Sequence, residues 1–184
     1  LAEACARGAL AHLTVRACPS LKPCAHPPHT LLTPSPMRVC GHWQELWLGS
    51  NQIGDPGVRA LAEACANGAM ANLTILYLCW NEIGHTGVAY LAEACASGAL
   101  PNCTKLVLRG NQMGDPGMTA LAEACASGAL AKCTHIYLNY NKIGDSGVTA
   151  LASACASGAL ANLISLNLDI NQIGDAGVSS LASA

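Results

Sequence analysis

The stretch that decides the fold is LTILYLCWNEIG, residues 73–84. It is one copy of a unit that returns along the chain every 30 residues. Two series of residues keep this spacing without drift: Asn51, Asn81, Asn111, Asn141 and Asn171, and Leu61, Leu91, Leu121, Leu151 and Leu181. A constant period in this range is typical of proteins built from stacked structural units. Because one unit alone cannot bury its apolar side, stacking is expected to create a single continuous core.

The pattern of the unit is Leu-x-x-Leu-x-Leu-x-x-Asn-x-Ile-Gly, and it resembles the leucine-rich repeat of the ribonuclease-inhibitor-like type. Nucleotide-binding innate sensors and Ran GTPase-activating proteins contain arrays of this type. The resemblance covers residues 1–14 and 45–184. It implies an α/β leucine-rich repeat solenoid, a horseshoe with a parallel sheet on the concave face and helices on the convex face.

The sequence divides into three segments: a partial N-terminal repeat at 1–14, an irregular Pro-rich insertion at 15–44, and a repeat array at 45–184 whose last repeat is truncated. Residues 1–6 repeat residues 61–66, so the chain begins inside a helix, and we expect a fragment of a longer array. The insertion holds six of the nine prolines, which excludes regular helix or strand. Removing it restores the unit pattern across the junction. We hypothesise a translated retained intron, and the alternative is a genuine disordered loop.

Composition narrows the classes of function. The chain is 52% hydrophobic, only 11% charged, and has a net charge of −2, which argues against nucleic acid or an anionic membrane as partner. No apolar run is long enough to span a membrane, and the start does not resemble a signal peptide. Most of the eleven cysteines recur at unit positions that are expected to be buried. We therefore expect a reduced, cytoplasmic protein, against the alternative of an oxidised one.

Each unit is expected to begin with a short strand, at 46–48, 76–78, 106–108, 136–138 and 166–168, with its two aliphatic residues inward. The following Asn is expected to bond backbone groups of the turn and form a ladder. An Asp then caps the N-terminus of a helix of about eleven residues, such as 56–66. Its apolar face consists of Val58, Leu61, Ala62 and Cys65. A helix-stopping Gly follows, at positions 68, 98, 128 and 158.

The positions around the strand that differ between units point to the concave face, and these carry two of the three Trp and three of the four Tyr. Exposed Trp, Tyr and Arg are the usual anchors of interfaces, so a protein ligand is expected there, although aromatic residues are also good strand formers. The densest pairs are expected to be Tyr77 with Trp80 and Tyr137 with Tyr140, alongside Trp47. The candidate binding residues are Glu45, Trp47, Ile75, Tyr77, Cys79, Trp80, Lys105, Val107, Arg109, His135, Tyr137, Asn139, Tyr140, Asn167 and Asp169.

Catalytic and metal chemistry find little support in the sequence. The possible ligands of the insertion have a spacing that matches no common zinc pattern; they are Cys18, Cys24, His26, His29, Cys40 and His42. His135 and Cys79 are in non-adjacent units, about 10 Å apart, too far for a nucleophile–base pair. No phosphate-binding loop is present. We therefore expect a non-catalytic binding or scaffold protein with no cofactor and no metal. The alternative, implied by the resemblance to Ran GTPase-activating proteins, is a regulator of a small GTPase that uses Arg109.

Overall fold

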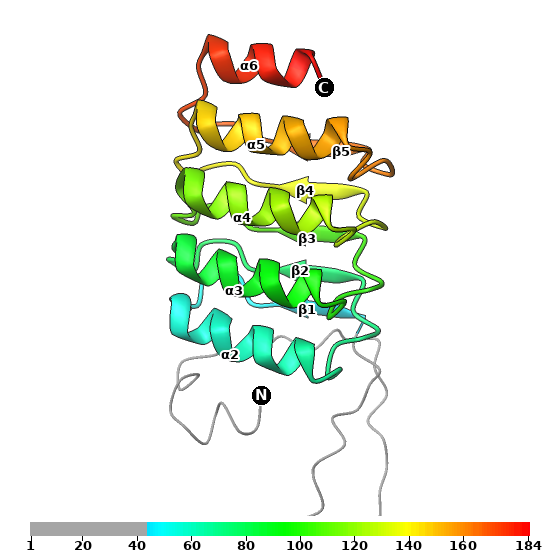
Figure 1. Cartoon of the computed structure of the whole chain (residues 1–184). Coiled ribbons are helices and arrows are strands. Elements are labelled where there is room, and N and C mark those ends of the chain that lie inside the picture. The colour runs from blue at the N-terminus through cyan, green and yellow to red at the C-terminus, as the bar shows by residue number, and fades with distance from the viewer. Residues whose placement is uncertain (1–43) are drawn as a thin grey trace, which may run out of the picture.

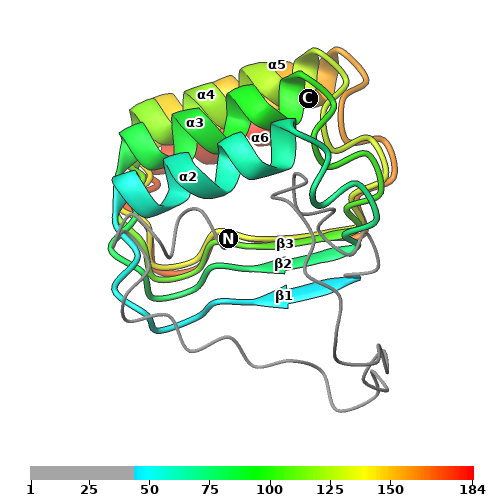
Figure 2. The same ribbon diagram turned by 90° about the horizontal axis from the view of Figure 1, so that it is seen from below.

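The computed structural model describes residues 44–184, which form a stack of five strand–helix units (Figure 1). The elements are β1 (Glu45–Trp47), α2 (Asp55–Ala66), β2 (Ile75–Tyr77), α3 (His85–Ala96), β3 (Lys105–Val107), α4 (Gly114–Ala126), β4 (His135–Tyr137), α5 (Asp145–Ala156), β5 (Ser165–Asn167) and α6 (Asp175–Ala182). The strands form one parallel sheet in the order β1-β2-β3-β4-β5. Figure 2 shows the helices in one layer and the strands in another. This confirms the expected α/β solenoid.

The expectations about residues 1–43, including the partial first repeat and the candidate metal ligands of the insertion, lie outside the described residues. Gln44, which we assigned to the insertion, is described, and its carbonyl oxygen accepts hydrogen bonds from the backbone amides of Thr74 (2.7 Å) and Ile75 (3.0 Å). The carbonyl of Thr74 does the same for Thr104 and Lys105 one unit later. Gln44 therefore already follows the backbone pattern of the array.

The strands begin and end one residue earlier than expected, although the sides of the sheet are as predicted. In β1 the exposed residues Glu45 and Trp47 flank the buried Leu46, and Leu48 is buried immediately after the strand. The unit is in register with the next, since Leu46 pairs with Leu76. The inward direction of the two aliphatic residues is thus confirmed.

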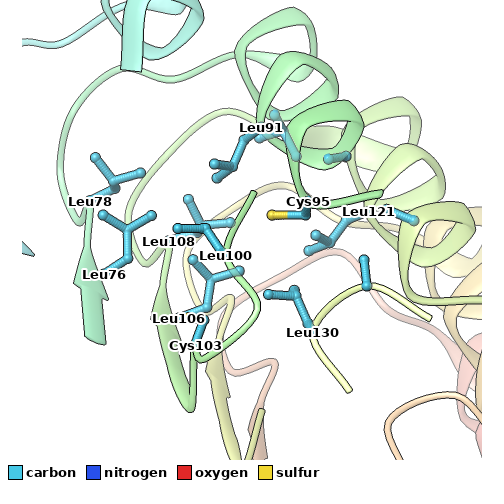
Figure 3. Packing of buried hydrophobic residues seen from close by; sticks show 14 of the residues in the cluster. Leu76, Leu78, Leu91, Cys95, Leu100, Cys103, Leu106, Leu108, Leu121 and Leu130 are labelled. Carbon is cyan, nitrogen blue, oxygen red and sulfur yellow. The ribbon is translucent and has the colours of Figure 1, made fainter. Parts of the chain in front are cut away.

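The core lies between the sheet and the helices and is made of aliphatic and thiol side chains (Figure 3). The helix face predicted from α2, which consists of Val58, Leu61, Ala62 and Cys65, is buried. The cysteines at 65, 95, 103, 125 and 133 are buried as expected, and all seven cysteines in residues 44–184 are free. In Figure 3, side chains from the strands face Leu91, Cys95 and Leu121, which belong to the helices.

The Asn ladder is confirmed, and Asn81 shows how it works. Its Oδ1 accepts hydrogen bonds from the backbone amides of Asn51 (2.9 Å) and Ile53 (3.2 Å) in the preceding unit. Its Nδ2 donates to the carbonyl of Leu48 (2.7 Å), also in the preceding unit. One side-chain amide therefore satisfies three backbone groups of the neighbouring turn. These groups lie beyond the end of the strand and have no hydrogen-bond partner in the sheet.

The Asp residues do not cap their own helices, which corrects our prediction. The helix N-caps are glycines in α2, α3, α5 and α6, and no side chain bonds there from within the unit. Instead, Asp55 Oδ1 accepts a hydrogen bond from the amide of Gly84 (2.7 Å), and Asp145 Oδ1 accepts from Gly174 (2.7 Å) and Gly177 (3.0 Å). Each carboxylate thus caps the helix of the following unit and links consecutive helices.

The helix of the third unit is capped differently, because the second unit has His85 at the position where the other units have Asp. His85 offers no carboxylate to Gly114, whose amide instead donates to the carbonyl of Asn141 (3.0 Å). Gly114 takes a left-handed backbone with φ of 56°, and α4 begins there rather than one residue later. The Oδ1 of Asn141 is buried and has no hydrogen-bond partner among the described residues. We attribute the interruption of the ladder to the missing carboxylate.

Replacing His85 by Asp is expected to raise the free energy of unfolding by about 1–2 kcal/mol, since it supplies the missing acceptor and allows Asn141 Oδ1 to rejoin the ladder. Urea unfolding followed by circular dichroism would measure the change. His85→Asn is the matched control, because it has a similar size but no charge and should gain less. A loss of stability in His85→Asp would contradict this account of the third unit.

Candidate functional site

The sheet face opposite the helices, here called the open sheet face, consists of the side chains at positions 45, 47, 49 and 50 and at their counterparts in the later units. All fifteen predicted site residues belong to it. Six are exposed: Glu45, Trp47, Trp80, Arg109, Tyr140 and Asp169. Seven are half-buried: Ile75, Tyr77, Cys79, Lys105, His135, Tyr137 and Asn167. Two are buried, Val107 and Asn139.

One cation of the open face lies between two tyrosines from neighbouring units. Lys105 Nζ is 5.7 Å from the ring centre of Tyr77 and 5.3 Å from that of Tyr137. The register explains this arrangement, because Val107 pairs with Tyr77 on one side and Tyr137 on the other. Val107 is short, so the two larger side chains rise above it, and this accounts for its burial. Trp47 extends the row by stacking on Tyr77, with ring centres 3.8 Å apart.

A second cation, at the end of the same unit, packs against two rings that also contact each other. The guanidinium carbon of Arg109 is 5.6 Å from the ring centre of Trp80 and 5.2 Å from that of Tyr140. The two rings are themselves 5.5 Å apart. Gly110 makes this approach possible, since a Cβ placed on it would collide with the Trp80 ring. Gly110 was not among the predicted site residues. The sequence does single it out, because the equivalent residues of the other units all have side chains: Ser50, Trp80, Tyr140 and Ile170.

The aromatic residues therefore associate across units, and not in the within-unit pairs that we expected. We call the two groups the Lys105 sandwich (Tyr77, Lys105 and Tyr137) and the Arg109 sandwich (Trp80, Arg109 and Tyr140). In the second group the two rings also contact each other, and the cation lies beside both. In each, the third unit supplies the cation, and the second and fourth units supply the rings. Parallel strands place equivalent residues about 4.8 Å apart, whereas residues three apart along an extended chain are about 10 Å apart. Column neighbours are thus the natural partners.

Trp80 and Tyr140 occupy a backbone conformation that does not suit them. Their φ angles are 55° and 61°, in the left-handed region, where a non-glycine residue costs roughly 1–2 kcal/mol. Gly110 has a φ of 69° at the same position of the third unit and avoids this cost. The fold alone would therefore favour glycine at positions 80 and 140. The same left-handed backbone recurs at the equivalent residues Ser50 and Ile170, with φ of 59° and 51°, so it belongs to the turn of the unit.

The charges of the two sandwiches are not neutralised within residues 44–184. The ion pair found in this part of the chain joins Arg59 and Glu63 on α2, away from the open face. The acidic residues of the open face have other partners. Glu45 accepts a hydrogen bond from Trp47 Nε1 (2.9 Å), and Asp169 accepts one from Asn167 Nδ2 (3.0 Å).

Asn139 adds an unsatisfied acceptor beside the Arg109 sandwich. It is 6% exposed, and its Oδ1 makes no hydrogen bond to any described residue. Its short side chain stands between those of Arg109 and Asp169, which are the equivalent residues of the adjacent units. Buried polar atoms without a partner are uncommon in folded proteins.

Other kinds of site find no support in the described part of the chain. No group of three or more His, Cys, Asp or Glu side chains in residues 44–184 is arranged to hold a metal ion. Within the same residues, no helix has both the length and the apolar character needed to cross a membrane.

Two solved structures are similar to parts of the chain, and both are internalins from Listeria monocytogenes str. 4b F2365. Internalin inlF is 20% identical, with a TM-score of 0.35, over 63% of this chain and 34% of its own. Internalin C2 is 22% identical, with a TM-score of 0.29, over 76% of each chain. The chain thus spans about a third of the length of inlF. These similarities are too weak to support an argument about function.

No curated protein sequence matches the chain. The family model described as "Leucine Rich repeat" matches more than half of it, in five segments: residues 44–62, 69–92, 101–122, 134–152 and 159–182. Each segment contains one complete strand of the sheet, together with part or all of the helix that follows. The chain belongs to the leucine-rich repeat family.

Proposed function

We propose that this protein is a non-catalytic recognition or scaffold module that binds a protein ligand on its open sheet face. The observation that carries the proposal is the pair of ring–cation sandwiches built from three consecutive units. Trp47, Trp80 and Tyr140 are all at least 36% exposed and all belong to this face. Monomeric proteins rarely expose contiguous aromatic surface without using it, and interfaces are enriched in Trp, Tyr and Arg.

The finer family type is also a proposal. Units of 30 residues with complete helices of 12 or 13 residues in α2 to α5 support the ribonuclease-inhibitor-like type. Regulation of a small GTPase, the alternative implied by the resemblance to Ran GTPase-activating proteins, has less support. Arg109 is the only arginine of the open sheet face, and its guanidinium packs against the rings of Trp80 and Tyr140.

Trp80→Gly is expected to reduce partner capture from an extract of the source cells by about tenfold or more, because Trp is the most frequent interface anchor. The change should leave the free energy of unfolding within about 1 kcal/mol of the parent. Glycine relieves the left-handed strain, and this offsets the lost contacts with Arg109 and Tyr140. Affinity capture with quantitative mass spectrometry measures the first effect, and urea unfolding measures the second.

Ser50→Gly is the matched control, since Ser50 has a φ of 59° at the equivalent position of the first unit and carries no ring. It should leave capture unchanged. Undiminished capture by Trp80→Gly, together with undiminished capture by Tyr140→Gly, would contradict binding through the open sheet face.

A further inference from the structure

We infer that the protein segment bound by the open sheet face is acidic, with carboxylates that reach Lys105 and Arg109. This inference rests on the proposed function and names the chemistry of its partner. The first reason is unused hydrogen-bonding capacity. A Lys ammonium has three donors and an Arg guanidinium has five. Neither the Lys105 ammonium nor the Arg109 guanidinium donates a side-chain hydrogen bond to another residue of the described array; their contacts there are with ring faces.

The second reason is the distribution of charge. Residues 44–184 contain ten Asp and Glu but only five Lys and Arg, and two of these five lie together in the third of the five units on the open face. The acidic residues of the face, Glu45 and Asp169, are in the first and fifth units. The face is thus positive at its centre and negative at both sides. This pattern attracts a short acidic segment to the middle and opposes a long polyanion, such as a nucleic acid, that would cross the whole sheet.

The third reason is preorganisation. Each cation contacts two rings, which restrict its side chain, so it loses less freedom than an unrestrained side chain when it pairs with a carboxylate. The rings also cover part of each cation, which strengthens the pairing relative to a fully solvated one.

The spacing of the two cations suggests how such a segment lies. Lys105 and Arg109 are four residues apart, which is about 13 Å of extended chain. An extended partner that runs along β3 would place side chains i and i+4 on one face at the same separation. The segment is therefore expected to carry two acidic residues four positions apart, with small or apolar residues between them facing the rings.

Selection of linear peptides from a random display library tests the inference, with the full chain and three variants as baits. The parent should enrich peptides with an Asp or Glu excess, often four positions apart. Lys105→Gln/Arg109→Gln should lose this excess. Lys132→Gln/Lys142→Gln removes the same charge outside the open sheet face and should retain it. The third variant, Tyr77→Ala/Trp80→Gly, removes one ring from each sandwich and should enrich no peptide of the parent set.

Binding constants of the most enriched synthetic peptide then give the size of the effect. Its dissociation constant should rise about tenfold or more in Lys105→Gln/Arg109→Gln, and the charge-conserving Lys105→Arg/Arg109→Lys should stay within about threefold of the parent. Binding to the parent should also weaken as salt is added.

The outcomes separate the inference from the proposed function. The inference is overturned, and the binding function is left intact, if the enriched peptides are lost in Tyr77→Ala/Trp80→Gly but show no acidic excess. The same holds if they bind Lys105→Gln/Arg109→Gln as well as the parent. If the parent enriches no peptide relative to Tyr77→Ala/Trp80→Gly, both the inference and peptide binding through the open sheet face are rejected.

Discussion

Replacing Asn81 by Ala is expected to lower the free energy of unfolding by about 3–5 kcal/mol, because three buried backbone groups lose their partner at once. These groups are the amides of Asn51 and Ile53 and the carbonyl of Leu48, all of which bond the Asn81 side chain. Asn81 is fully buried, so water cannot replace the lost hydrogen bonds. An unpaired buried donor or acceptor costs about 1–3 kcal/mol.

Asn171→Ala is the matched control. The Asn171 side chain bonds the amides of Asn141 and Ile143 and the carbonyl of Leu138 in the same pattern, but the residue is only half-buried. Water can reach the released groups there, so the expected loss is about 1–2 kcal/mol. Urea unfolding followed by far-ultraviolet circular dichroism measures both variants. Equal losses would show that burial does not set the cost, and a small loss at Asn81 would show that the ladder is not a main source of stability.

Features that recur in every unit could be predicted from the sequence alone. The inward leucines, the buried helix face of α2 and the Asn ladder all follow from one pattern, because each unit serves as a reference for the others. The helix stops are equally regular: Gly98 has a φ of 85°, and the amide of Ala99 bonds the carbonyl of Ala94 to close the helix end. Repetition makes such positions visible without any relative for comparison.

Features that depend on the neighbouring unit were harder to predict. Asp55 looks like a cap when its own helix is considered alone, but stacking brings Gly84 of the next unit within 2.7 Å of its carboxylate. The departure of His85 from the pattern is plain in the sequence, whereas its consequence lies one unit further on, at Gly114. In the same way, the burial of Val107 depends on the size of Tyr77 and Tyr137, which are its neighbours only across the sheet.

Thiol ionisation is expected to make this fold unusually sensitive to alkaline pH. Burial raises the pKa of Cys65 from 9.0 to about 11. Burial, reinforced by neighbouring cysteines, raises the pKa of Cys95 and of Cys125 to about 12. These three residues occupy equivalent positions on α2, α3 and α4, at the centre of the core. A thiolate there would be an unpaired charge in an apolar environment.

The direction of the effect follows from the proton balance. Below pH 9 the thiols are protonated in both states, so their contribution to stability is fully present. Above pH 9 the unfolded chain releases protons that the native core retains, so the free energy of unfolding falls as the pH rises toward the folded pKa values. Each thiol contributes up to about 1.4 kcal/mol per pH unit, and the three together remove about 6–8 kcal/mol between pH 8 and pH 11. This is comparable with the whole stability of a typical domain, which is about 5–15 kcal/mol.

Unfolding by urea under reducing conditions, at several pH values between about 8 and 11, measures this slope. The triple variant Cys65→Ala/Cys95→Ala/Cys125→Ala is the control. It should be less stable at pH 8, because the cavity left by each substitution costs about 1 kcal/mol. Its stability should fall less steeply with pH than that of the parent, and the slope that remains comes in part from Cys103, whose pKa is raised by its hydrogen bond with Cys133 and by burial. The two curves should therefore converge as the pH rises, and they should cross if the parent loses more to ionisation than the variant loses to cavities. Parallel curves would show that the buried thiols do not control the alkaline stability of the array.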